Sequence, residues 1–103
     1  MKKYKVWWSP QALDDIKQIY DYIYEQSPKG ADTVFDTLLN LGDSLETLPE
    51  RFPIEPKSFD HTHTYRFIPK WNYKILYRIN FDAELVIIAQ ILSTKQNPDN
   101  FQV

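Results

Sequence analysis

The chain contains no cysteine and no run of apolar residues long enough to cross a membrane. The first absence excludes a disulfide scaffold, a thiol nucleophile and a metal site built on thiolates. The second excludes a transmembrane helix, which needs about 18 or more apolar residues. The N-terminus is basic, but Ser9-Pro10 and Asp14-Asp15 interrupt the apolar segment that a signal peptide requires. We therefore expect a soluble, cytoplasmic protein that has no membrane partner.

The composition predicts one folded domain, residues 1–103, because 43% of the residues are apolar and 16% are aromatic. The net charge is −2, but it is divided unevenly. Residues 10–48 carry two lysines against eight carboxylates, whereas residues 57–78 carry five cations against one carboxylate. An anionic ligand responds to the local field, so this division predicts two surfaces with different partners. The alternative is that the charges only coat solvated faces.

Two Ser-Pro pairs each mark the start of a helix, because serine is a favourable N-cap and proline suits the first helical position. The apolar stripe of the first helix, after Ser9-Pro10, is Leu13, Ile16, Ile19, Tyr20 and Ile23. The second helix follows Ser27-Pro28, its apolar stripe extends to Leu48, and Pro49 ends it. The short connection between the two predicts an antiparallel helical hairpin.

Four segments are typical of β-strands, because they are rich in aromatic and β-branched residues. They are residues 3–8, 65–68, 73–81 and 85–92. The last is almost continuously apolar, which predicts a place inside the sheet. The region from Pro49 to His63 contains too many prolines for a regular element.

This order predicts an α+β fold: an N-terminal strand, then an antiparallel helical hairpin packed on one face of a mainly antiparallel four-stranded sheet. In the third predicted strand, alternation places Tyr73, Ile75, Tyr77 and Ile79 on one face and Lys74, Leu76, Arg78 and Asn80 on the other.

The basic strands supply the candidate binding residues, since the hairpin leaves one face of the sheet uncovered. Arg66, Lys74 and Arg78 are candidate contacts to an anion, and the alternative is pairing with acidic neighbours on the sheet. Trp71 lies in a predicted turn and is a candidate exposed contact. The loop Asp60-His61-Thr62-His63 has two histidines without further ligands, so we predict no metal site and no cofactor.

Several motifs occur in an order and spacing that can be compared with known families. Along the chain they are Val6-Trp7-Trp8-Ser9-Pro10-Gln11-Ala12, Asp14-Asp15-Ile16, Leu45-Glu46-Thr47-Leu48-Pro49, Tyr65-Arg66, Tyr73-Lys74-Ile75-Leu76-Tyr77-Arg78-Ile79, Val86-Ile87-Ile88 and Lys95-Gln96-Asn97-Pro98. Over nearly the whole chain the sequence resembles toxins of the RelE/ParE superfamily of type II toxin–antitoxin modules, the plasmid stabilisation family. The resemblance implies the fold predicted above and a cognate antitoxin as partner.

The resemblance implies one of two targets. Some members are ribosome-dependent endoribonucleases that cut mRNA, and others poison DNA gyrase without accepted catalytic residues. For the ribonuclease branch, the resemblance makes Arg66, Lys74 and Lys95 candidate catalytic residues, as phosphate and transition-state contacts. Ser93 and Lys95 join Arg66, Lys74, Arg78 and Trp71 as candidate binding residues.

One departure from the ribonuclease pattern affects this choice. Many ribonuclease members carry a histidine at the end of the last strand, where this chain has Ser93-Thr94-Lys95. Serine is a poor proton donor, and an ordinary lysine, with a pKa of about 10.4, is poorly matched to acid catalysis at neutral pH. The helical hairpin with its Ser-Pro start resembles the gyrase-directed branch. A third hypothesis is a non-toxic scaffold that only binds an antitoxin.

Overall fold

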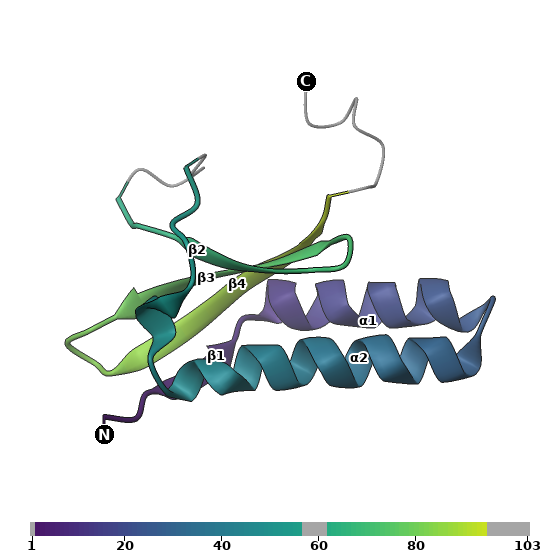
Figure 1. Ribbon diagram of the computed structural model, residues 1–103, viewed down its shortest axis with the longest axis horizontal. Helices are drawn as coiled ribbons and strands as arrows, with labels where there is room; N and C mark the ends of the chain where they lie inside the picture. Colours follow the sequence, from purple (N-terminus) through teal and green to yellow (C-terminus); the bar gives the residue numbers. More distant parts are fainter. Residues whose placement is uncertain (1, 57–61, 95–103) are drawn as a thin grey trace.

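The computed structural model describes residues 2–56 and 62–94. Two helices lie side by side along one face of a four-stranded sheet, with the strand order β1-β4-β3-β2 (Figure 1). The elements are β1 (Lys5–Trp8), α1 (Pro10–Tyr24), α2 (Pro28–Asp43), the 3₁₀ turns η1 (Ser44–Glu46) and η2 (Pro49–Arg51), β2 (Arg66–Lys70), β3 (Tyr73–Asn80) and β4 (Leu85–Ser93). The predicted α+β fold is confirmed.

Both helices begin as predicted from their Ser-Pro pairs. The Ser9 hydroxyl accepts a hydrogen bond from the backbone N–H of Ala12 at 3.1 Å, and the Ser27 hydroxyl accepts one from Gly30 at 3.0 Å. Each serine thereby satisfies an N–H group that has no partner within the first helical turn. The buried faces then pack on the sheet, with Ala12 and Ile16 from α1 and Leu38 from α2 among the core residues.

The predicted end of the second helix was wrong. The helix ends at Asp43, and Leu48 is 60% exposed with a left-handed φ of 47°, instead of continuing the apolar stripe. A residue before proline is disfavoured in the α region, which explains why the helix does not continue to Pro49. The region from Pro49, predicted to be irregular, contains η2 and an isolated bridge between Ile54 and Arg66.

The sheet combines one parallel pair, β1 with β4, and two antiparallel pairs. As predicted, the apolar strand β4 is interior. Leu76 pairs with Gln90 and Tyr77 pairs with Ile88, so Ala89 is an extra residue in β4. This β-bulge changes the alternation of β4, and the core residues are therefore Val86 and Ile88 before it but Ile91 after it.

The strand β2 extends through Pro69 and Lys70, two residues further than predicted. Proline is tolerated here because of its place at the edge of the sheet. The N–H of Phe67 donates outward to the carbonyl of Pro53 at 3.1 Å, and Pro69, two residues later, faces the same way. Its missing N–H therefore removes no hydrogen bond to β3.

The strand β4 extends beyond the end of β1. Residues 85–88 of β4 pair with β1, but the strand continues to Ser93. The Ser9 hydroxyl donates to the carbonyl of Ala89 at 2.9 Å, and the Asp15 carboxylate accepts from the N–H of Ile91 at 2.9 Å. The first turns of α1 thus satisfy groups of β4 that β1 does not reach. No helix in the described part of the chain is long and apolar enough to cross a membrane.

Candidate functional site

Arg66, predicted to contact phosphate, holds the turn that follows the helical hairpin. It is the first residue of β2 and lies opposite Tyr77 of β3. Its Nη1 donates to the backbone carbonyls of Phe52 at 2.7 Å and of Glu50 at 3.2 Å. The guanidinium group therefore donates hydrogen bonds to neutral backbone carbonyls of the protein itself. At least part of its hydrogen-bonding capacity is used in the fold.

Two further side chains bind the same turn. The hydroxyl of Tyr77 donates to the carbonyl of Pro49, and Arg51 donates to the carbonyls of Thr47 and Leu48. Tyr77 is fully buried, and burial raises its pKa to about 12, although the charges of Arg66 and Arg51 act in the opposite direction. The turn between α2 and β2 is thus fixed to the core through a neutral tyrosine.

The raised pKa of Tyr77 predicts a loss of stability at alkaline pH. Its contribution is complete below about pH 10, the pKa of an unfolded tyrosine, and is lost as the pH rises towards the folded pKa of about 12. We expect Tyr77→Phe to cost about 1–2 kcal/mol at pH near 8, because the Pro49 carbonyl loses its donor. Between about pH 10 and 12, wild type should lose on the order of 2 kcal/mol that the variant retains.

Urea unfolding of both proteins across this pH range measures the effect. The pKa values of Tyr73, raised by burial, and of Tyr20, raised by its hydrogen bond to Asp32, affect wild type and variant equally. The difference between the two free energies of unfolding therefore isolates Tyr77. A difference that stays constant with pH would show that the hydroxyl does not titrate as assigned.

Lys74, the second predicted catalytic cation, is engaged in an ion pair. Its Nζ lies 2.6 Å from Oε1 of Glu55, and it also lies over the ring of Phe67 at 4.4 Å from the ring centroid. The Lys74 side chain is 28% exposed and the Glu55 side chain only 9%. Lys74 pairs with Pro69 and Arg66 with Tyr77, so strand alternation places the two cations on opposite faces of the sheet. The structure does not bring them together.

The remaining predicted residues are distributed over three places. Arg78 lines a cavity of about 440 Å³ together with Arg66. Trp71 is 54% exposed at the β2–β3 turn, where it has a left-handed φ of 53° and Lys70 lies 5.0 Å from its ring centroid. Ser93 lines a second cavity, described below. Lys95 lies outside the described residues.

A recess lies between α1 and the part of β4 that β1 does not cover. Its volume is about 710 Å³. Its lining residues are Asp15, Gln18, Ile19, Tyr22, Asn72, Tyr73, Ile91 and Ser93. We call it the α1–β4 groove. Sequence reasoning missed it, although one signal was present: the predicted last strand was longer than the first, which leaves an edge of the interior strand open.

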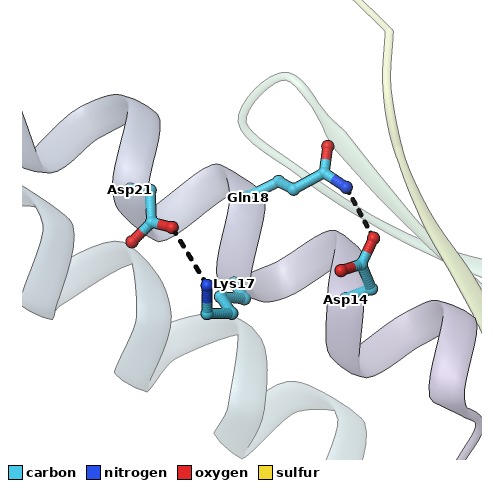
Figure 2. Close-up of polar contacts among 4 residues, drawn as sticks. All are labelled: Asp14, Lys17, Gln18 and Asp21. Carbon is cyan, nitrogen blue, oxygen red and sulfur yellow. Dashed lines mark hydrogen bonds and ion pairs between the residues drawn. The ribbon is translucent and has the colours of Figure 1, made fainter.

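Polar side chains on the exposed surface of α1 contact one another, and one of them, Gln18, lines the groove. Gln18 donates to the carboxylate of Asp14, and Lys17 lies 3.5 Å from Asp21, as Figure 2 shows. Such pairs one helical turn apart are worth only about 0.2–0.5 kcal/mol each. They are surface contacts that contribute little to the stability of the fold.

The described residues contain no group of three or more histidine, aspartate or glutamate side chains arranged to hold a metal ion. His61 of the predicted histidine loop lies outside the described residues, and His63 is placed beside Thr62, with 2.9 Å between its Nδ1 and the Thr62 hydroxyl.

The fold is similar to chains in solved toxin–antitoxin structures. The ParDE system from P. aeruginosa matches with a TM-score of 0.73 and 16% identity over 90% of this chain and 98% of that one. The RelBE2 complex from Mycobacterium tuberculosis matches with a TM-score of 0.65 and 18% identity over 90% of this chain and 93% of that one. The RelE–RelB complex from Pyrococcus horikoshii OT3 matches with a TM-score of 0.63 and 17% identity over 92% of this chain and 99% of that one. The architecture is thus one found in toxin–antitoxin complexes.

The sequence comparison is more specific. Residues 6–98 match the family described as the ParE toxin of the type II toxin–antitoxin system parDE. The chain therefore belongs to the ParE toxin family, and the RelE/ParE resemblance predicted from the sequence is confirmed. No curated protein gives a significant match.

Proposed function

We propose that this chain is a toxin that inhibits DNA gyrase by binding it, without catalytic chemistry of its own, and that a cognate antitoxin neutralises it. The observation that supports the proposal is the engagement of Arg66 and Lys74. A ribonuclease needs cations directed at the scissile phosphate, together with an acid and a base. Here Arg66 donates to the Phe52 and Glu50 carbonyls, and Lys74 is paired with Glu55 on the opposite face.

The family match favours the same target, because the resemblance described above includes a gyrase-directed branch that the Ser-Pro hairpin resembles. An antitoxin partner is supported by the similar solved structures, which are toxin–antitoxin systems and complexes. The α1–β4 groove suits such a partner, since it combines the end of β4 at Ser93, which β1 does not cover, with the exposed ring of Tyr22. Extended segments bind strand edges through main-chain hydrogen bonds.

Inducible expression in a bacterial host without the antitoxin tests the target. Incorporation of labelled thymidine and labelled methionine is followed in parallel, and we expect thymidine incorporation to fall first. The purified protein should also inhibit supercoiling of relaxed plasmid by gyrase. Early loss of methionine incorporation would contradict the proposal and support the mRNA endoribonuclease, whereas normal growth with folded protein present would support the non-toxic antitoxin-binding scaffold.

A further inference from the structure

A carboxylate is built into the outer face of the sheet, the face turned away from the helices (Figure 1). Ile75 and Tyr77 of β3 belong to the core, so alternation places Lys74 and Arg78 on the outer face. There the Nζ of Lys74 lies 2.6 Å from Oε1 of Glu55, whose side chain is only 9% exposed. The fold thus brings a negative charge to a strand that carries only cations in its own sequence.

Backbone hydrogen bonds fix the position of Glu55. Its N–H donates to the carbonyl of Tyr65 at 2.7 Å, and Pro53, two residues earlier, accepts from the N–H of Phe67 at 3.1 Å. This short segment therefore runs along the edge of β2. Because its backbone is held, the carboxylate pairs with Lys74 at a smaller loss of conformational freedom than two mobile surface side chains would suffer.

Without a carboxylate partner, Lys74 would suit a nucleic-acid backbone. Its ammonium group lies 4.4 Å from the centroid of the Phe67 ring, which keeps it on the outer face. Arg78 lies four residues further along the same face, a separation of about 13 Å along a strand. No ion pair involves Arg78 in the described part of the chain. Two cations at this spacing can contact two phosphates of one polynucleotide, but not a single phosphate group.

Glu55 opposes such binding in two ways. It occupies the ammonium group that a phosphate would need, and its own negative charge repels a phosphate that approaches. A phosphate that displaced Glu55 from Lys74 would leave a carboxylate with little access to water and without its cation. The exchange is therefore unfavourable, although Lys74 itself is 28% exposed.

We propose that Glu55 is a specificity-determining residue, which excludes the nucleic-acid backbone from the outer face of the sheet and so restricts this toxin to a protein target. Glu55 contacts no target itself and acts through Lys74. The assignment rests on the proposed inhibition of gyrase by binding alone, and it names the residue that prevents the same scaffold from binding mRNA.

The test measures the binding of a fluorescein-labelled poly(U) oligonucleotide to the full chain by fluorescence anisotropy, at several salt concentrations. Glutamine in place of Glu55 keeps the shape of the side chain and an acceptor for Lys74, but removes the charge. We expect Glu55→Gln to bind about tenfold more tightly than wild type, because a charge-assisted contact to phosphate becomes available. The slope of log K against log salt should steepen by about 0.7, the value for one further phosphate contact to a single strand.

Two further variants separate this local effect from a change in net charge. Glu25→Gln removes an exposed carboxylate at the end of α1 and should change the affinity less than about twofold. The double variant Glu55→Gln, Lys74→Gln should lose the gain. Circular dichroism checks that each protein is folded, and Glu55→Ala, with the same expected gain, is the second variant if Glu55→Gln does not fold.

Three results would overturn the proposal. They are a gain in Glu55→Gln no larger than in Glu25→Gln, a gain that persists without Lys74, and a salt dependence equal to that of wild type. A poly(dT) oligonucleotide should show the same gain as poly(U), because the phosphates are the groups bound. A gain confined to RNA would contradict the assignment to the backbone.

The outcome is distinguishable from that of the gyrase test. A gain in Glu55→Gln, in a protein whose wild type leaves gyrase unaffected, would refute the gyrase proposal and leave the role of Glu55 intact. Inhibition of gyrase by wild type, with no gain in Glu55→Gln, would refute only the role of Glu55.

Discussion

Replacing Lys74 by methionine is expected to lower the free energy of unfolding by about 3 kcal/mol, the largest effect predicted for any single change in this chain. The reason is the setting of the ion pair. Glu55 has a side chain that is only 9% exposed, and its carboxylate lies 2.6 Å from the Lys74 ammonium group. In the variant that carboxylate stays where water has little access, without the Lys74 cation. Urea unfolding followed by circular dichroism measures the loss.

A matched control is Lys17→Met, because Lys17 also lies near a carboxylate but its side chain is 75% exposed. Its cost should stay within about 0.5 kcal/mol. The double variant Lys74→Met, Glu55→Leu should recover most of the stability, since apolar replacement of both partners of a buried pair is often neutral. A cost for Lys74→Met as small as that of the control would mean that the pair does not stabilise the fold.

The same double variant separates two functions. If Lys74 contacted a transition state, a stable protein that lacks it would fail to arrest translation. If the chain inhibits gyrase without catalysis, the double variant should still reduce thymidine incorporation. Folded protein is thereby distinguished from active protein, which a single Lys74 substitution would not achieve.

Gly42→Ala is expected to cost about 2–3 kcal/mol, although alanine normally favours a helix by about 1 kcal/mol over glycine. A Cβ at this position would lie 2.3 Å from Cζ2 and 2.8 Å from Cη2 of Trp8, and 2.9 Å from Cδ1 of Ile88. These neighbours are a ring and a core side chain, and the Trp8 indole also donates to Asp43 at 3.1 Å. In a domain of this size, such a loss lowers Tm by roughly 10 °C or more.

A second substitution, at Trp8, should relieve part of the clash that Gly42→Ala creates. Trp8→Phe removes the indole atoms that the new Cβ would meet, so it should cost less in the Gly42→Ala protein than in wild type. Asp36→Ala, on the exposed face of the same helix, is the control for helix propensity. Additive effects of Gly42→Ala and Trp8→Phe would argue against direct contact between α2 and the indole ring.

The parts of the fold that were predictable from sequence depend on local signals. The Ser-Pro pairs mark both helix starts, and the continuous apolar run of β4 indicates its interior place. The end of α2 was not predictable in this way. Leu48 continues the helical spacing, but the adjacent proline and the hydrogen bonds of Arg51 to the carbonyls of Thr47 and Leu48 determine a turn there instead. Those bonds depend on side-chain geometry that spacing does not specify.

The contacts of the candidate-site residues were likewise not predictable from the sequence. Sequence placed Arg66, Lys74 and Arg78 on neighbouring strands and treated them as one group. It did not reveal that Glu55, from the segment between the hairpin and β2, would pair with Lys74, or that the carbonyls of Glu50 and Phe52 would accept from Arg66. Both facts depend on where a proline-rich segment without periodicity packs, and that is decided by long-range contacts.

The position of Pro69 has a consequence for the behaviour of the free protein. A toxin released from its partner is exposed to other copies of itself, and the outer strand of a sheet is where identical chains can join into aggregates. On β2 the N–H of Phe67 is already bound to the Pro53 carbonyl, and Pro69 has no N–H to offer. A second copy arriving at this edge finds no continuous row of donors, so indefinite growth of the sheet is blocked on that side by the covalent structure of one residue.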